Sequence, residues 1–191
     1  MSRQADFPID ELFLRRWSPR AMSGEPVTQA DLSRLLEAAR WAPSSGNGQP
    51  WRFIYGLAGT PDFTRLFNLL ADGNKPWCGR AGALLVVVSR KVRDNGQPAR
   101  THSFDTGAAW MSFALQGSLQ GLVVHGMEGF DYDRARSELA VPDDHNVEMM
   151  IAVGHPGALA DLPEKYRPRE APSSRQPMAG LSFAGRFGAK E

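Results

Sequence analysis

Several residue types and segments are scarce or absent in this sequence, and each absence narrows the class of protein. The chain has one cysteine among 191 residues, so no disulfide can form within it. No apolar run reaches the roughly 20 residues that a membrane span needs. Charges interrupt the N-terminal residues, which is atypical of a signal peptide or anchor. With a formal net charge of +1, we expect a soluble, cytoplasmic protein that binds neither nucleic acid nor membranes.

The motifs of common nucleotide and metal sites are missing too. There is no GxGxxG and no GxxxxGK[ST] sequence, so neither a Rossmann site nor a P-loop is indicated. The Asp105-Thr106-Gly107 tripeptide resembles that of aspartic proteases, but it opens a helical pattern instead of ending a strand. No metal-ligand spacing relates Cys78 to the four histidines, which are His102, His125, His145 and His155. We expect no metal and assign no catalytic residue.

Helical and strand patterns alternate along the chain. We expect helices over Val27–Trp41, from Pro61 to Leu70, over Phe104–Gln120 and over Tyr132–Leu139, and extended segments at Trp51–Leu57, Ala83–Ser89, Leu122–Gly129 and Val147–Val153. Thr28 and Ser103 are the expected N-caps of the first and third helices, and Asp72–Arg80 is expected to be a break. Alternation of this kind suggests a parallel α/β sheet, although it does not fix strand direction.

Two segments have the residues of a ligand site. Arg15-Arg16-Trp17-Ser18-Pro19-Arg20 places arginines and a hydroxyl where they could surround a phosphate, or it could be only a solvated basic stretch. The second segment, Pro43–Trp51, combines hydroxyls, amides and two glycines between two prolines. Amides suit the edge of a heteroaromatic ring, but an ordinary connection rich in turn formers would look similar.

Taken together and in this order, the two segments resemble the nitroreductase family of flavoproteins. Arg16-Trp17-Ser18-Pro19-Arg20 is similar to the family's R-x-S-x-R opening, and Pro43–Trp51 matches its P-S-S-x-N-x-Q-P-W signature. Later segments resemble the family's G-F-D and R-x-P-L elements, at Val124–Asp131 and Arg175–Met178. Asn74 lies where the family has an asparagine near the flavin. The family variant with a lysine near position 173 has no counterpart here.

The resemblance implies an α+β fold with a central, mostly antiparallel sheet flanked by helices, which replaces the parallel expectation. Residues 1–155 would form an FMN-binding core, and residues 156–191 would be an extension of the same domain that wraps around the partner in a homodimer. The FMN sites would lie at the dimer interface, and their implied residues are Arg16, Trp17, Ser18, Arg20, Pro43, Ser44, Ser45, Asn47, Gln49, Asn74, His125, Gly126, Met127, Gly129 and Arg175. Among them, Arg20 and Arg175 are expected to bind the FMN phosphate.

The same resemblance implies the chemistry. NAD(P)H would transfer hydride to flavin N5, and a nitroaromatic, quinone or similar small oxidant would then take it in a ping-pong cycle. Two alternatives stay open. The chain could be a flavin-binding or storage protein without turnover, or a specialised relative that reduces an enal or aldehyde or cleaves flavin.

Overall fold

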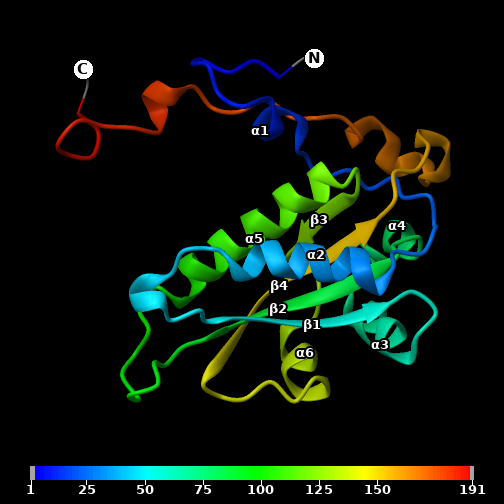
Figure 1. Cartoon of the computed structure of the whole chain (residues 1–191). Helices are drawn as coiled ribbons and strands as arrows, with labels where there is room; N and C mark the ends of the chain where they lie inside the picture. Colours follow the sequence, from blue (N-terminus) through cyan, green and yellow to red (C-terminus); the bar gives the residue numbers. More distant parts are fainter. Residues whose placement is uncertain (1–2, 190–191) are drawn as a thin grey trace.

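A four-stranded antiparallel sheet forms the centre of the computed structural model, which describes residues 3–189 (Figure 1). Its strand order is β1-β2-β4-β3, and the strands are β1 (Trp51–Leu57), β2 (Ala83–Arg90), β3 (Val123–Met127) and β4 (His145–Gly154). Leu57 pairs with Ala83, so the chain re-enters the sheet at the end where β1 finished. The parallel arrangement suggested by alternation is therefore wrong, and the antiparallel α+β arrangement implied by the resemblance is confirmed.

Helices cover both faces of this sheet. Their bounds are α1 (Glu11–Arg15), α2 (Gln29–Arg40), α3 (Pro61–Leu69), α4 (Lys75–Cys78), α5 (His102–Leu119) and α6 (Tyr132–Glu138), with short 3-10 helices η1 (Ser45–Asn47), η2 (Leu159–Asp161), η3 (Glu164–Arg169) and η4 (Met178–Gly180). The expected cap of α2 is confirmed. The Thr28 side chain accepts from the backbone N–H of Asp31, and the Asp31 carboxylate accepts from the backbone N–H of Thr28.

Strand β2 is buried on both faces because it separates two hydrophobic cores. Leu84, Val86 and Val88 pack with residues of α3, α4 and α6. Leu85 and Val87 point the other way, toward α2 and α5. A continuous apolar run is the pattern expected of such a strand.

Three elements differ from the sequence expectations. Helix α1 was not expected; Asp10 caps it by accepting from the N–H of Leu12, although none of its residues is buried. The expected break at 72–80 contains α4, whose Trp77 and Cys78 are drawn into the core. Helix α5 begins earlier than expected, with Thr101 at its N-cap position, and the Ser103 hydroxyl donates to Glu148 instead of capping.

Residues 3–10 and residues 171–178 run side by side outside the body of the molecule (Figure 1). Two hydrogen bonds join them: Arg3 Nε donates to Ser173 O at 3.1 Å, and Met178 N donates to Asp6 Oδ2 at 3.2 Å. Several apolar side chains of this tail are exposed, and Phe187 is 95% exposed. Within residues 3–189, no helix combines the length and hydrophobicity needed to cross a membrane.

Candidate ligand-binding site

Three arginines from distant parts of the sequence gather near the start of the chain. Burial lowers the pKa of the Arg16 guanidinium, and the positive charges of Arg3 and Arg175 lower it further. Burial and Arg175 likewise lower the pKa of Arg3. The positive charges of the three arginines thus repel one another, and no anion in the cluster offsets the repulsion among the described residues. Such a cluster attracts an anionic group, and the sequence pattern had not included Arg3 in it.

Ser18 belongs to the same neighbourhood. Arg16 Nη1 donates to its hydroxyl oxygen at 3.4 Å, while Arg3 Nη1 donates to the carbonyl of Arg16 at 2.6 Å. Arg175 currently donates only to nearby groups of Ser173 and Ser174. The structure thus brings the Arg16 side chain close to Ser18 and within the field of Arg175. It does not bring Arg20 into this cluster.

The Arg20 side chain instead points to α4, where its guanidinium carbon lies 5.9 Å from the centroid of the Trp77 ring. It lines a hollow of about 420 Å³, here called the cationic cavity, whose residues are Arg20, Gly73, Asn74, Trp77, Lys165, Tyr166 and Arg169. Asn74, another of the expected residues, lines this cavity, and its Nδ2 donates to the carbonyl of the expected Gly129 at 2.9 Å. Nothing in the sequence pattern had indicated Lys165, Tyr166 or Arg169.

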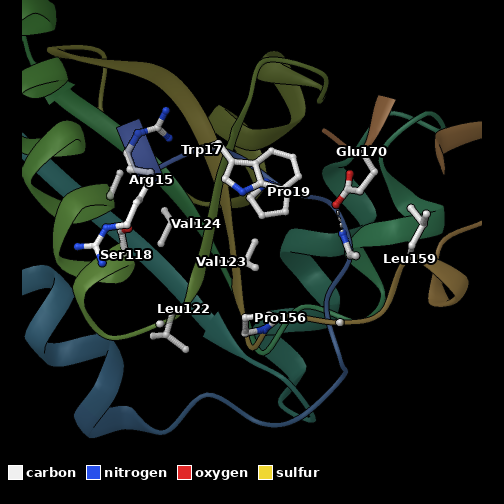
Figure 2. A pocket seen from close by; sticks show the side chains of 15 residues that line it. Arg15, Trp17, Pro19, Ser118, Leu122, Val123, Val124, Pro156, Leu159 and Glu170 are labelled. Carbon is white, nitrogen blue, oxygen red and sulfur yellow. Dashed lines mark hydrogen bonds between the residues drawn. The ribbon is translucent and has the colours of Figure 1, made fainter. Parts of the chain in front are cut away.

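A second hollow of about 390 Å³ lies along β3 and is mostly apolar (Figure 2). This apolar groove is lined by residues that include Arg16, Trp17, Pro19, Ser118, Leu122, Val123, Val124, Pro156, Leu159 and Glu170. Trp17 therefore belongs to the groove and not to the cationic cavity. Glu170 closes one side, where its carboxylate accepts from the backbone N–H groups of Arg20 and Ala21.

Side chains of β3 face inward. The His125 ring lies 4.6 Å from that of Trp77, and its Nδ1 is 2.8 Å from Pro19 O. Met127 contacts the thiol of Cys78, which is buried. A side chain at Gly126 would collide with Trp110 and Met149. The His125 and Met127 side chains therefore contact the core. Gly129, which follows β3, is the expected residue of this segment that bonds to Asn74.

The loop after α2 has an unusual backbone. Gly46, Asn47 and Gln49 adopt positive φ angles of 59°, 54° and 44°. Left-handed conformations at the two non-glycine residues are uncommon and cluster at functional sites. Ser44 Oγ accepts from the N–H of Gln49 across the loop. Pro43 and residues 45–49 are exposed. The loop is therefore held in a defined shape while its polar groups stay available.

Asp105 holds this loop from α5. Asp105 is 7% exposed, and its carboxylate accepts from Ser45 N at 3.1 Å and from Thr101 Oγ1 at 3.0 Å. Sequence reasoning had considered Asp105 only as part of a protease tripeptide. Its position at the start of a helical pattern after a polar segment was the available signal for an orienting role.

We expect Asp105→Ala to cost about 1–3 kcal/mol of unfolding free energy, because the Ser45 N–H loses its acceptor. Denaturant unfolding measures the loss, and amide hydrogen exchange at Ser45 should accelerate. Asp105→Asn, which retains an acceptor oxygen, is the matched control and should lose less. Unchanged exchange at Ser45 in the alanine variant would contradict the orienting role.

His125 should make folding sensitive to acid. Burial lowers the pKa of its imidazole, and the positive charge of Arg20 acts in the same direction, although the Pro19 carbonyl and Glu170 oppose them. Below about pH 6.5, the usual histidine pKa, His125 becomes protonated in the unfolded chain but stays neutral in the folded chain. The contribution is therefore present above that pH and lost as pH falls. On acidification, the unfolding free energy of the wild type should fall more than that of His125→Gln. An equal dependence on pH in the two proteins would show that His125 is not the cause.

Two possible kinds of reactive centre have little support. Burial raises the pKa of the Cys78 thiol, which keeps it protonated and poorly nucleophilic. In the part of the chain that the structure describes, no three histidine, cysteine, aspartate or glutamate side chains gather as a metal site. The groups available for function are thus the arginine cluster, the cationic cavity and the oriented loop.

Comparison with known proteins agrees with the resemblance seen in the sequence. The model of the nitroreductase family matches residues 14–55 and 58–155. A 5,6-dimethylbenzimidazole synthase of Rhodospirillum rubrum is 44% identical over 184 residues, which cover 83% of this chain and 87% of that protein. An NADH dehydrogenase of Thermus thermophilus is 27% identical over 172 residues, covering 75% and 84%. A crystal structure described as an oxidoreductase containing FMN has a TM-score of 0.94 at 44% identity, covering 98% of this chain and 97% of that one.

Proposed function

Because the chain belongs to the nitroreductase family, we propose that it is an FMN-dependent oxidoreductase that takes hydride from NADH or NADPH and passes it to a nitroaromatic, a quinone or a similar small oxidant. The observation that carries the proposal is the cluster of Arg3, Arg16 and Arg175. Arg3 donates to the carbonyl of Arg16, and burial together with the positive charge of Arg175 lowers the pKa values of Arg3 and Arg16. A bound anion would stabilise these cations, and the phosphate of FMN has the required charge.

The residues present fit FMN at both ends of the cofactor. Arg16, Ser18 and Arg175 would hold the phosphate with help from Arg3, while Arg20 and Asn74 would face the ring from the cationic cavity. When bound, FMN supplies the centre that accepts and donates hydride. The protein contributes orientation, and the positive charge of Arg20 favours a ring that gains negative charge on reduction.

A complete site needs two chains. Arg16 lines the apolar groove together with Ser118 near the end of α5, whereas Ser45 is bound to Asp105 near the beginning of that helix. Asp105 and Ser118 lie thirteen residues apart on α5, which is about 20 Å at about 1.5 Å per residue. The two motifs of one chain therefore lie toward opposite ends of α5, which favours a site shared between two chains. We propose a homodimer in which the loop of 43–50 from each chain completes the site of the other.

The exposed tail supplies a further argument for the dimer. Met178, Leu181 and Phe187 are exposed apolar residues, and such side chains usually cover another surface. The apolar groove on the edge strand β3 of the partner offers that surface.

Truncation before Arg175 should therefore weaken both association and FMN binding, which are linked by mass action. Light scattering and FMN titration measure the two effects. Full-length Arg175→Ala is the control that removes the cation and keeps the tail, so it should lose FMN affinity while its association weakens less than that of the truncated chain. A truncated chain that stays dimeric with full FMN affinity would show that the tail has neither role.

Turnover tests the proposed reaction. The FMN-loaded protein should oxidise NADH or NADPH with a quinone, and double-reciprocal plots at several quinone concentrations should be parallel, as ping-pong exchange requires. If neither nucleotide supports quinone reduction although FMN is bound, flavin storage becomes the better account.

A second candidate function is favoured by one comparison, the 44% identity to a 5,6-dimethylbenzimidazole synthase. The dimethylated ring of that product is also present in flavin, so the alternative is oxidative fragmentation of reduced FMN by O₂. Incubation of reduced FMN with the protein in air distinguishes the two functions by mass spectrometry. An oxidoreductase returns the flavin intact, whereas a synthase consumes it and releases 5,6-dimethylbenzimidazole.

A further inference from the structure

The cationic cavity has more positive charge than contact with one flavin ring requires. Arg20, Lys165 and Arg169 all line it, and within residues 3–189 none of them forms an ion pair with a carboxylate. Glu170, which follows Arg169, is occupied elsewhere: its Oε1 accepts from the backbone N–H groups of Arg20 and Ala21 at 2.7 and 2.8 Å. The positive field of the cavity is therefore available to a ligand.

The segment that supplies the two extra cations is fixed to the body of the protein. Tyr166 packs against the core, and its hydroxyl donates to Gly73 O at 2.7 Å. Arg167 lies between the two cations in sequence but is already engaged: it donates to Leu162 O at 3.0 Å and to Ala160 O at 3.1 Å. Lys165 and Arg169 are thus held at the cavity on a short 3-10 helix, and little further ordering of the backbone would be needed for binding.

The residues that line the cavity differ in exposure. Trp77 is buried and Arg20 and Asn74 are half-buried, whereas Lys165 and Arg169 are exposed. Among these inner residues, Arg20 and Asn74 are the ones assigned to FMN above. The outer pair is accessible from solvent, as expected of groups that meet a ligand arriving and leaving in each cycle.

We propose that Lys165 and Arg169 bind the 2′-phosphate of NADPH and make NADPH the preferred electron donor. This inference rests on the proposed function. NADPH differs from NADH only in that phosphate monoester, and an arginine near it is the usual means of accepting NADP. Arginine can bind the phosphate oxygens through two N–H groups, and lysine adds a compact positive charge.

Titration calorimetry with unreactive NADP⁺ and NAD⁺ on FMN-loaded protein tests the proposal without turnover. The Lys165→Gln/Arg169→Gln variant should bind NADP⁺ at least about tenfold more weakly, because charge-assisted hydrogen bonds are lost, and should bind NAD⁺ as the wild type does. The kcat/KM for NADPH should fall by a similar factor. Arg65→Gln, which changes an exposed arginine of α3 that pairs with Asp62, is the control and should leave NADP⁺ binding unchanged.

Three results would overturn the inference. Equal weakening of NADP⁺ and NAD⁺ would assign the pair to a group that both nucleotides share. A fall in FMN affinity, measured by flavin fluorescence, would assign the pair to the cofactor. Unchanged NADP⁺ binding would remove any role in donor choice. Failure of the proposed function is distinguishable from all three, because the wild-type protein itself would then fail to bind FMN or to be reduced by either nucleotide.

Discussion

The double variant Arg16→Ala/Arg175→Ala should lose nearly all preference for FMN over riboflavin, which lacks the phosphate. Each charge-assisted contact to a phosphate is worth about 1.5–3 kcal/mol, so the loss of both should weaken FMN binding by two orders of magnitude or more. The cluster with Arg3 gives the physical reason, since these cations repel one another until an anion is bound. Fluorescence titrations of flavin-free protein with FMN and with riboflavin measure the effect.

Riboflavin makes this test specific. Its affinity should change little in the double variant, because the ring contacts of Arg20 and Asn74 remain. Arg34→Ala is a suitable control, since Arg34 forms an exposed pair with Asp31 on α2, away from the cluster. If riboflavin binding falls as much as FMN binding, the arginines support the fold of the site and do not select the phosphate.

Replacement of Phe113 by alanine should have the largest effect on stability. This α5 residue is fully buried, lies 5.9 Å from the ring of Phe53 on β1, and joins α5 to the sheet. Removal of a buried phenylalanine costs about 3–5 kcal/mol through lost burial and the cavity left behind. At about 2–4 °C per kcal/mol for a domain of this size, the melting temperature should fall by about 10 °C.

The conservative variant Phe113→Leu controls for shape and should cost less, because most of the buried volume is kept. Met111→Ala provides a second control on the same helix, at a residue that is 38% exposed. Melting of flavin-free protein should be followed by circular dichroism. A Phe113→Ala protein that melts within about 2 °C of the wild type would contradict the role of this contact between α5 and the sheet.

Local patterns predicted most of the elements. Thr28 and Pro61 set the starts of α2 and α3, and the apolar run of β2 identified a strand between two cores. Strand direction could not be obtained in this way, because it depends on where α3 and α4 return the chain. Helix α4 was missed because it has four residues, one of them a proline, and so short a helix shows no repeat of apolar residues.

The candidate site was predicted in its motifs and less well in its grouping. Sequence spacing joined Arg16 and Arg20 in one phosphate-binding segment, but their side chains diverge, Arg16 toward Arg175 and Arg20 toward Trp77. Arg3 and Lys165 could not be found, since single cations near the ends of a chain form no pattern. Arg3 is identified where the N-terminal segment bonds to the tail at Ser173, and Lys165 is identified where it lines the cationic cavity.

Anaerobic reduction tests the central claim most directly. The protein, purified or reconstituted with FMN, should show the yellow absorption band of flavin, and one equivalent of NADPH per bound FMN should bleach it without oxygen. Addition of a quinone should then restore the band in full. A protein that remains colourless after incubation with FMN, or whose bound flavin neither NADPH nor NADH bleaches, would contradict the account.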